Sequence, residues 1–201
     1  MKKILASVIF VLLFQISSFA QESSELRAPA IGVSFFFNDF ITPQRIRSSA
    51  LTTVLIEDGW ADFREMSPGL AITYFNGLKQ RIDFAGTLGA SFVKMPEKSS
   101  ANSTEESLLL EGDASFHFKM FPEKYVVTPY VIGGFGASYY KSSFGAFLPL
   151  GAGLKVNFFD EASLFLSMQY RVPLTTETNN YHFVTSIGIS GIVGKKNGNG
   201  K

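Results

Sequence analysis

The sequence predicts an all-β fold, a closed antiparallel up-and-down β-barrel of about eight strands. Segments in which apolar and polar residues alternate recur along most of the 201 residues, and short turn-like sequences separate many of them. Hydrophobic residues make up 46% of the chain and charged residues only 17%, which is few charges for a fully solvated surface. The chain has no cysteine, so its stability cannot come from disulfides.

The alternation is sharpest in the segment LLLEGDASFHFKM, which begins at Leu108 and ends at Met120. Its charged face carries Glu111, Asp113, His117 and Lys119, whereas the other face is apolar. Successive side chains of a strand point to opposite sides. This segment therefore separates an apolar medium from a polar one.

The first twenty residues predict a secretory signal peptide that is cleaved before Gln21. Lys2 and Lys3 precede an apolar run, and Ser18-Phe19-Ala20 forms a small-x-small site. A retained anchor is the alternative, but the apolar run is shorter than the roughly 20 residues that a spanning helix needs. Removing both lysines changes the formal net charge from +1 to −1, so we expect no nucleic-acid partner.

The remaining elements follow in order. Residues 21–29 are a short leader, expected in the periplasm, and residues 195–201 are a polar tail. Strands are predicted at 30–37, 68–75, 81–93, 108–120, 125–140, 144–158, 164–172 and 181–193. The facing of 125–140 is not assigned by its Gly-rich pattern. The long stretch from Asn38 to Ser67 is irregular, with a helix expected at 48–56.

Alternation alone fits a soluble barrel as well as a membrane barrel, but three features favour the membrane. The polar faces are rich in Gly, Ala and Ser, which suits a narrow lumen. Tight turns at 76–79, 121–124 and 159–161 alternate with looser connections at 38–67, 94–106 and 175–180, and 141–143 is a short member of the second set. Aromatic residues collect near both ends of the strands. We therefore expect a barrel at 30–194 in the outer membrane of a Gram-negative-type bacterium.

Several short motifs support this prediction: Pro68-Gly69-Leu70, Pro129-Tyr130, Gly133-Gly134-Phe135-Gly136 and Pro149-Leu150-Gly151-Ala152-Gly153. With the strand pattern, they make residues 30–193 resemble the small outer-membrane β-barrel family, in particular the N-terminal barrel of outer membrane protein A-like proteins. Many members continue into a peptidoglycan-binding domain, and we expect none here. The last strand also lacks the terminal aromatic residue of the family pattern.

The charged residues on the polar faces predict a lumenal network of paired charges. Its expected members are Arg81, Asp83, Glu111, Asp113, His117, Lys119, Lys155 and Arg171. Asp113, Ser115 and His117 share a face and invite comparison with a catalytic triad, but Asp113 and His117 are expected about 13 Å apart. We therefore expect no enzyme. His117 and His182 lack the spaced partners of a metal site, and we expect no metal and no cofactor.

The expected role is structural or that of an extracellular interaction surface, with the lumen plugged by the polar network. Candidate interaction residues in the 38–67 loop are Phe40, Trp60 and Phe63. We expect a monomer with periplasmic termini, with outer-membrane lipid and the assembly machinery as partners and an extracellular partner for this loop. The alternatives are a lipid-modifying outer-membrane enzyme and a soluble exported lipid-binding β-barrel.

Overall fold

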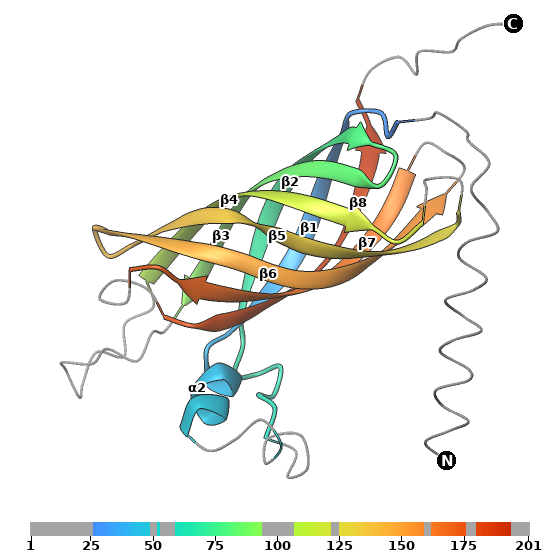
Figure 1. Cartoon of the computed structure of the whole chain (residues 1–201). Coiled ribbons are helices and arrows are strands. Elements are labelled where there is room, and N and C mark those ends of the chain that lie inside the picture. Colours follow the sequence, from blue (N-terminus) through green and yellow to red (C-terminus); the bar gives the residue numbers. More distant parts are fainter. Residues whose placement is uncertain are drawn as a thin grey trace, which may run out of the picture.

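A computed structural model describes residues 26–48, 52, 59–93, 107–121, 125–158, 162–175 and 180–193. The predicted signal peptide, most of the leader and the C-terminal tail lie outside these residues. The described elements form a closed antiparallel barrel with one short helix (Figure 1). They are β1 (Ala30–Asp39), α2 (Ile41–Ser48), β2 (Ser67–Lys79), β3 (Ile82–Val93), β4 (Ser107–Lys119), β5 (Val127–Tyr140), β6 (Ser143–Phe158), β7 (Ala162–Pro173) and β8 (His182–Ile192).

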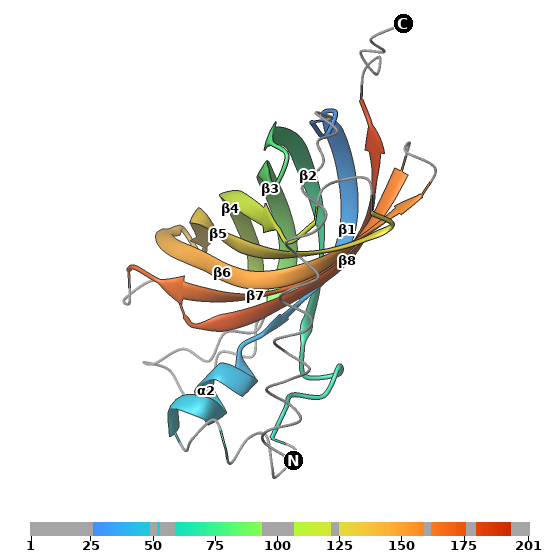
Figure 2. The ribbon, with the colours of Figure 1, turned by 45° about the vertical axis from the view of Figure 1, so that its right-hand side comes forward.

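The barrel closes because β1 pairs with both β2 and β8. Phe35 lies opposite Leu70 on one side and opposite Ile187 on the other. Figure 2 shows β1 and β8 side by side at this closure. A closed sheet has no edge, so every strand finds its hydrogen bonds within the wall, as a barrel in lipid requires.

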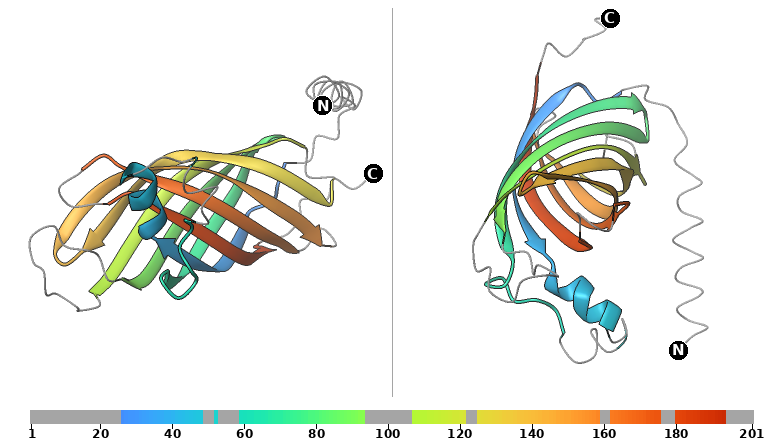
Figure 3. Two further views of the ribbon diagram at one scale, coloured as in Figure 1. Left: turned by 90° about the horizontal axis from the view of Figure 1, so that it is seen from below. Right: turned by 90° about the vertical axis from the view of Figure 1, so that its left-hand side faces the viewer.

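The orientation of the two faces is clearest in β4. Leu108, Leu110, Phe116 and Phe118 are exposed on the outside, whereas the alternate residues from Leu109 to Lys119 are buried inside. The same arrangement continues around the wall. Figure 3 shows the curvature of this wall in two further views. The predicted fold class and the predicted facing of this strand are confirmed.

The structure also assigns the facing of β5, which the sequence left open. Thr128, Tyr130 and Ile132 point inward and are buried, whereas Val131 and Phe135 are exposed on the outside. Two adjacent glycines follow Ile132, so apolar and polar side chains do not alternate in the middle of this strand.

The first predicted turn was misplaced. Asn76 and Gly77 belong to β2, which runs on to Lys79, and the turn lies at residues 80 and 81. The pairing of β2 with β3 shifts register between Gly77 and Lys79, and the Gly77 N–H donates to the carbonyl of Arg27 at 3.2 Å. This irregularity allows the strand to continue through an Asn-Gly pair that usually marks a hairpin turn.

The described helix of the long loop, α2, precedes the predicted one. Asp39 caps α2, because its Oδ1 accepts hydrogen bonds from the N–H groups of Ile41 and Thr42, both at 2.9 Å. Most of the predicted helix at 48–56 lies outside the described residues. Across the described part of the chain, no helix is long and apolar enough to cross a membrane.

The connection between β5 and β6 is a tight turn of two residues rather than a short member of the looser set. Lys141 has a φ of 44° and Ser142 a φ of 66°. Positive φ at both central positions is the geometry of a type I′ hairpin turn, which usually carries Asn and Gly. The sequence lacks those residues, so it gave no signal for this turn. The hairpin lies at the same end of the barrel as α2 (Figure 1).

Candidate functional site in the barrel lumen

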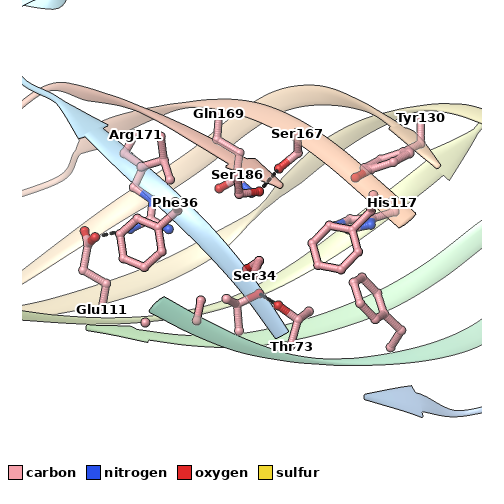
Figure 4. A pocket seen from close by; sticks show the side chains of 16 residues that line it. Ser34, Phe36, Thr73, Glu111, His117, Tyr130, Ser167, Gln169, Arg171 and Ser186 are labelled. Atoms are coloured by element: carbon pink, nitrogen blue, oxygen red, sulfur yellow. Dashed lines mark hydrogen bonds and ion pairs between the residues drawn. The ribbon is translucent and has the colours of Figure 1, made fainter. Parts of the chain in front are cut away.

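A cluster of charged side chains lies in the lumen toward the α2 end. Arg171 of β7 forms ion pairs with Glu111 and with Asp113 of β4, in the second case at 3.5 Å between Nη2 and Oδ2. His182, at the start of β8, places Nε2 at 3.3 Å from Glu111 Oε1. All four side chains are buried. Figure 4 shows Arg171 and Glu111 directed toward each other across the lumen.

Aromatic rings enclose this cluster. Phe40 lies over His182, with 4.6 Å between ring centroids, and Phe147 lies 4.7 Å from the guanidinium carbon of Arg171. Phe40 is buried and packs against Val93 and Leu109. The prediction that Phe40 is an extracellular interaction residue is therefore wrong, because Phe40 covers the lumenal cluster instead.

A second charged cluster lies toward the other end of the barrel. Asp83 accepts from Lys119 Nζ at 2.7 Å and from Arg27 Nη1 at 3.5 Å. Arg27 also donates to Ser190 Oγ at 3.2 Å, and its guanidinium lies 4.2 Å from the centroid of the Phe75 ring. Lys155 is buried beside these groups. Paired charges of this kind tolerate burial because each ion has an opposite charge close by.

Arg81 is not part of this cluster, contrary to the prediction. It lies in the turn between β2 and β3 and is exposed, and its backbone carbonyl accepts from the Lys119 N–H of β4 at 2.8 Å. Arg27 occupies the expected position beside Asp83. The sequence prediction missed Arg27 because residues 21–29 were assigned to a polar leader. The sequence feature that could have indicated its role is the position of this arginine, three residues before the first strand.

Ser115 and His117 lie between the two clusters. Ser115 Oγ is 3.4 Å from His117 Nε2, and the His117 ring stacks on Tyr130 with 4.7 Å between centroids. Asp113 faces Arg171, and no hydrogen bond joins it to His117 in the described residues. The three residues therefore lack the carboxylate–imidazole contact that orients a catalytic base. Among the described residues, no three His, Cys, Asp or Glu side chains could hold a metal ion.

Hydroxyl groups line another part of the lumen. The Oγ atoms of Ser167 and Ser186 are 2.7 Å apart (Figure 4). The Oγ1 atoms of Thr73 and Thr87 are 3.2 Å apart. The cavity that these groups line has a volume of about 40 Å³, and a second cavity beside Arg27 has about 10 Å³. A cavity measured in this way needs roughly 10–15 Å³ to hold one water molecule, so the first cavity has room for water.

The other two predicted loop residues lie outside the barrel. Trp60 is 39% exposed, with its ring centroid 6.1 Å from that of Phe183. Phe63 is 75% exposed and meets the edge of Phe37 at 5.7 Å. Neither side chain takes part in the lumenal clusters.

An apolar outer surface, a charged interior and a closed antiparallel wall together define an integral membrane β-barrel of the outer-membrane type. Several solved structures are similar to this chain. Neisserial surface protein A aligns over 86% of this chain and 100% of its own, with 14% identity and a TM-score of 0.51. The N-terminal barrel of Pseudomonas aeruginosa OprF aligns over 81% and 96%, with 14% identity and a TM-score of 0.46. Yersinia pestis Ail aligns over 82% and 95%, with 16% identity and a TM-score of 0.46. No protein-family model and no curated protein sequence matches this chain.

Proposed function

We propose that this protein is a structural outer-membrane barrel whose lumen is closed to solutes and whose α2 end faces the outside of the cell. The observation that carries this proposal is the lumenal cluster of Glu111, Asp113, Arg171 and His182, which lies across the interior beneath Phe40. The cavity beside this cluster has a volume of about 40 Å³, and the cavity beside the second cluster around Asp83 has about 10 Å³.

Opening a continuous path would require these ion pairs to separate. The Arg171 guanidinium and the Glu111 carboxylate are each almost completely shielded from solvent, so each depends on the other for its stabilisation. Removing one member of a buried ion pair costs about 3–5 kcal/mol. An open state that breaks the same contacts is therefore expected to be rare, and the barrel serves as a rigid support for its outer loops.

The orientation follows from the lengths of the connections. Long loops face the outside in outer-membrane barrels, and short turns face the periplasm. The segment between β1 and β2, which includes α2, is therefore extracellular, while the start of β1 and the end of β8 are periplasmic. We further propose that insertion depends on the outer-membrane assembly machinery.

Ion flux through the purified full chain tests the closed lumen. In liposomes loaded with potassium, the wild-type protein should give a flux close to that of protein-free vesicles. The double variant Glu111→Ser and Arg171→Ser removes the central pair together and should give a higher flux, while Leu110→Ala on the outer face should not change it. A wild-type flux comparable with that of an open porin would refute the proposal.

A further inference from the structure

The outward-facing side chains of β7, β8 and β1 change character toward the α2 end. Aliphatic and phenyl side chains are exposed along the middle of these strands, and outward positions near the α2 end carry Tyr170, Phe183 and Phe37. On β7, Val172 lies one outward position beyond Tyr170. The exposed residues of the middle part are Leu166, Met168, Ile187, Ile189, Val33 and Phe35. A change to a ring of aromatic side chains at the end of an apolar band marks the boundary between hydrocarbon and headgroups.

The loop that contains α2 adds its own aromatic rings to this boundary. Trp60 lies against Phe183 and Phe63 lies against Phe37, so the loop segment 59–65 runs along the outside of the wall. Tyr170 lies 5.0 Å from Phe183 between ring centroids. We call this surface the aromatic rim, and it consists of Phe37, Trp60, Phe63, Tyr170, Tyr181 and Phe183.

Contacts from α2 hold the loop part of the rim in place. Thr42 Oγ1 accepts from the Ala61 N–H at 2.9 Å, directly after Trp60. Arg45 donates to the carbonyls of Gly59 and Trp60, both at 3.2 Å, and pairs with Glu65 at 3.7 Å. The backbone on both sides of Trp60 is thus tied to the helix, which fixes its ring against the barrel wall.

A positive charge lies at the same level as the rim. The guanidinium carbon of Arg47, in the last turn of α2, is 4.2 Å from the centroid of the Tyr181 ring. The ring restricts the positions that the guanidinium can take. Arginine binds phosphate groups strongly through paired N–H donors. Aromatic rings beside an arginine, directly above an apolar band, fit the headgroup of a phosphate-bearing lipid.

We propose that the aromatic rim and Arg47 bind phosphate-bearing lipids of the outer leaflet. Trp60 and Phe63 then lie in the membrane interface, and Arg47 contacts the phosphate. This assigns the two exposed aromatic residues of the loop to lipid rather than to a soluble partner. The occupant is lipid because the rim continues the lipid-facing surface of the same three strands. The inference holds whether or not the lumen is closed, but its assignment to the outer leaflet rests on the proposed orientation of the α2 end.

Trp60 is the one tryptophan of the chain, so its fluorescence reports on the rim alone. The full chain is reconstituted into phosphatidylcholine vesicles that contain lipid brominated near the headgroup end of the acyl chain. The brominated lipid should quench Trp60, and aqueous acrylamide should quench it weakly. Strong quenching by acrylamide without quenching by the brominated lipid would place Trp60 in water and overturn the proposal.

The role of Arg47 is tested by comparing brominated phosphatidylglycerol with brominated phosphatidylcholine as quenchers. The wild-type protein should prefer the anionic lipid, and Arg47→Gln should reduce this preference about fivefold, as expected for one arginine near an anionic surface. Arg81→Gln, an exposed arginine in the turn at the opposite end, is the matched control and should leave the preference unchanged. Equal quenching by both lipids in the wild type, or an unchanged preference in Arg47→Gln, would contradict the assignment of Arg47.

Discussion

Arg171→Ala should destabilise the barrel by about 3–5 kcal/mol or prevent it from folding. The substitution leaves the carboxylates of Glu111 and Asp113 buried beside each other without the guanidinium that pairs with both. It also removes the cation that lies against the Phe147 ring. The measurement is the denaturant midpoint of the detergent-folded protein, together with the difference in gel mobility between unheated and boiled samples.

Removing the negative charges together with the arginine separates the electrostatic cause from simple loss of side-chain volume. The triple variant Glu111→Gln, Asp113→Asn and Arg171→Met has no net charge in this part of the cluster and similar side-chain volumes. It should recover most of the lost stability, because replacing a whole buried ion pair is often neutral. Wild-type stability in Arg171→Ala, or a triple variant as unstable as the single one, would contradict this explanation.

The same substitution at two adjacent glycines of β5 should lower the stability at one position and leave it nearly unchanged at the other. In Gly134→Ala, the new Cβ would lie 2.6 Å from the Ser115 Cα and 2.8 Å from the Ser115 Cβ on the neighbouring strand. The backbones of β4 and β5 must therefore move apart, with an expected loss of about 1–3 kcal/mol. The denaturant midpoint of the detergent-folded variant measures this loss.

Gly133→Ala is the matched control in the same strand. Its Cβ would have no atom within 4 Å, because Gly133 faces outward. The change in stability should stay within about 0.5 kcal/mol. If both variants lose the same stability, the effect comes from the loss of glycine itself, and the explanation by close approach of β4 and β5 is wrong.

The period-two pattern predicted those parts of the fold that depend on local sequence. The two faces of β4 were assigned correctly, because a strand buried on one side must alternate. The β5–β6 turn was not recognised, because Lys141 and Ser142 adopt positive φ without the residues that favour it. The Asn76-Gly77 pair gave the opposite error, since contacts with Arg27 and a register shift keep it within a strand.

The charged residues on the polar faces of the strands predicted that the lumen would carry buried charges of both signs. The pattern could not predict which charges would pair. Glu111 and Arg171 come from strands that are not neighbours in the wall, so their contact depends on the curvature of the whole barrel. Phe40 was expected outside because it lies in the long loop, yet the Asp39 cap and the packing on His182 hold it over the lumen. The contacts across the lumen arise only after closure, and no local pattern encodes them.

A barrel embedded in lipid requires the alternate facing of β4, and single cysteines carrying a nitroxide label measure this facing. The natural chain has no cysteine, so each label reports on one position. In a lipid bilayer, labels at Leu108, Leu110, Ala114 and Phe116 should collide frequently with oxygen dissolved in the hydrocarbon, and labels at Leu109 and Ser115 should not. Equal collision rates at both sets, or higher rates at Leu109 and Ser115, would contradict a barrel with its charged face inside and its apolar face in lipid.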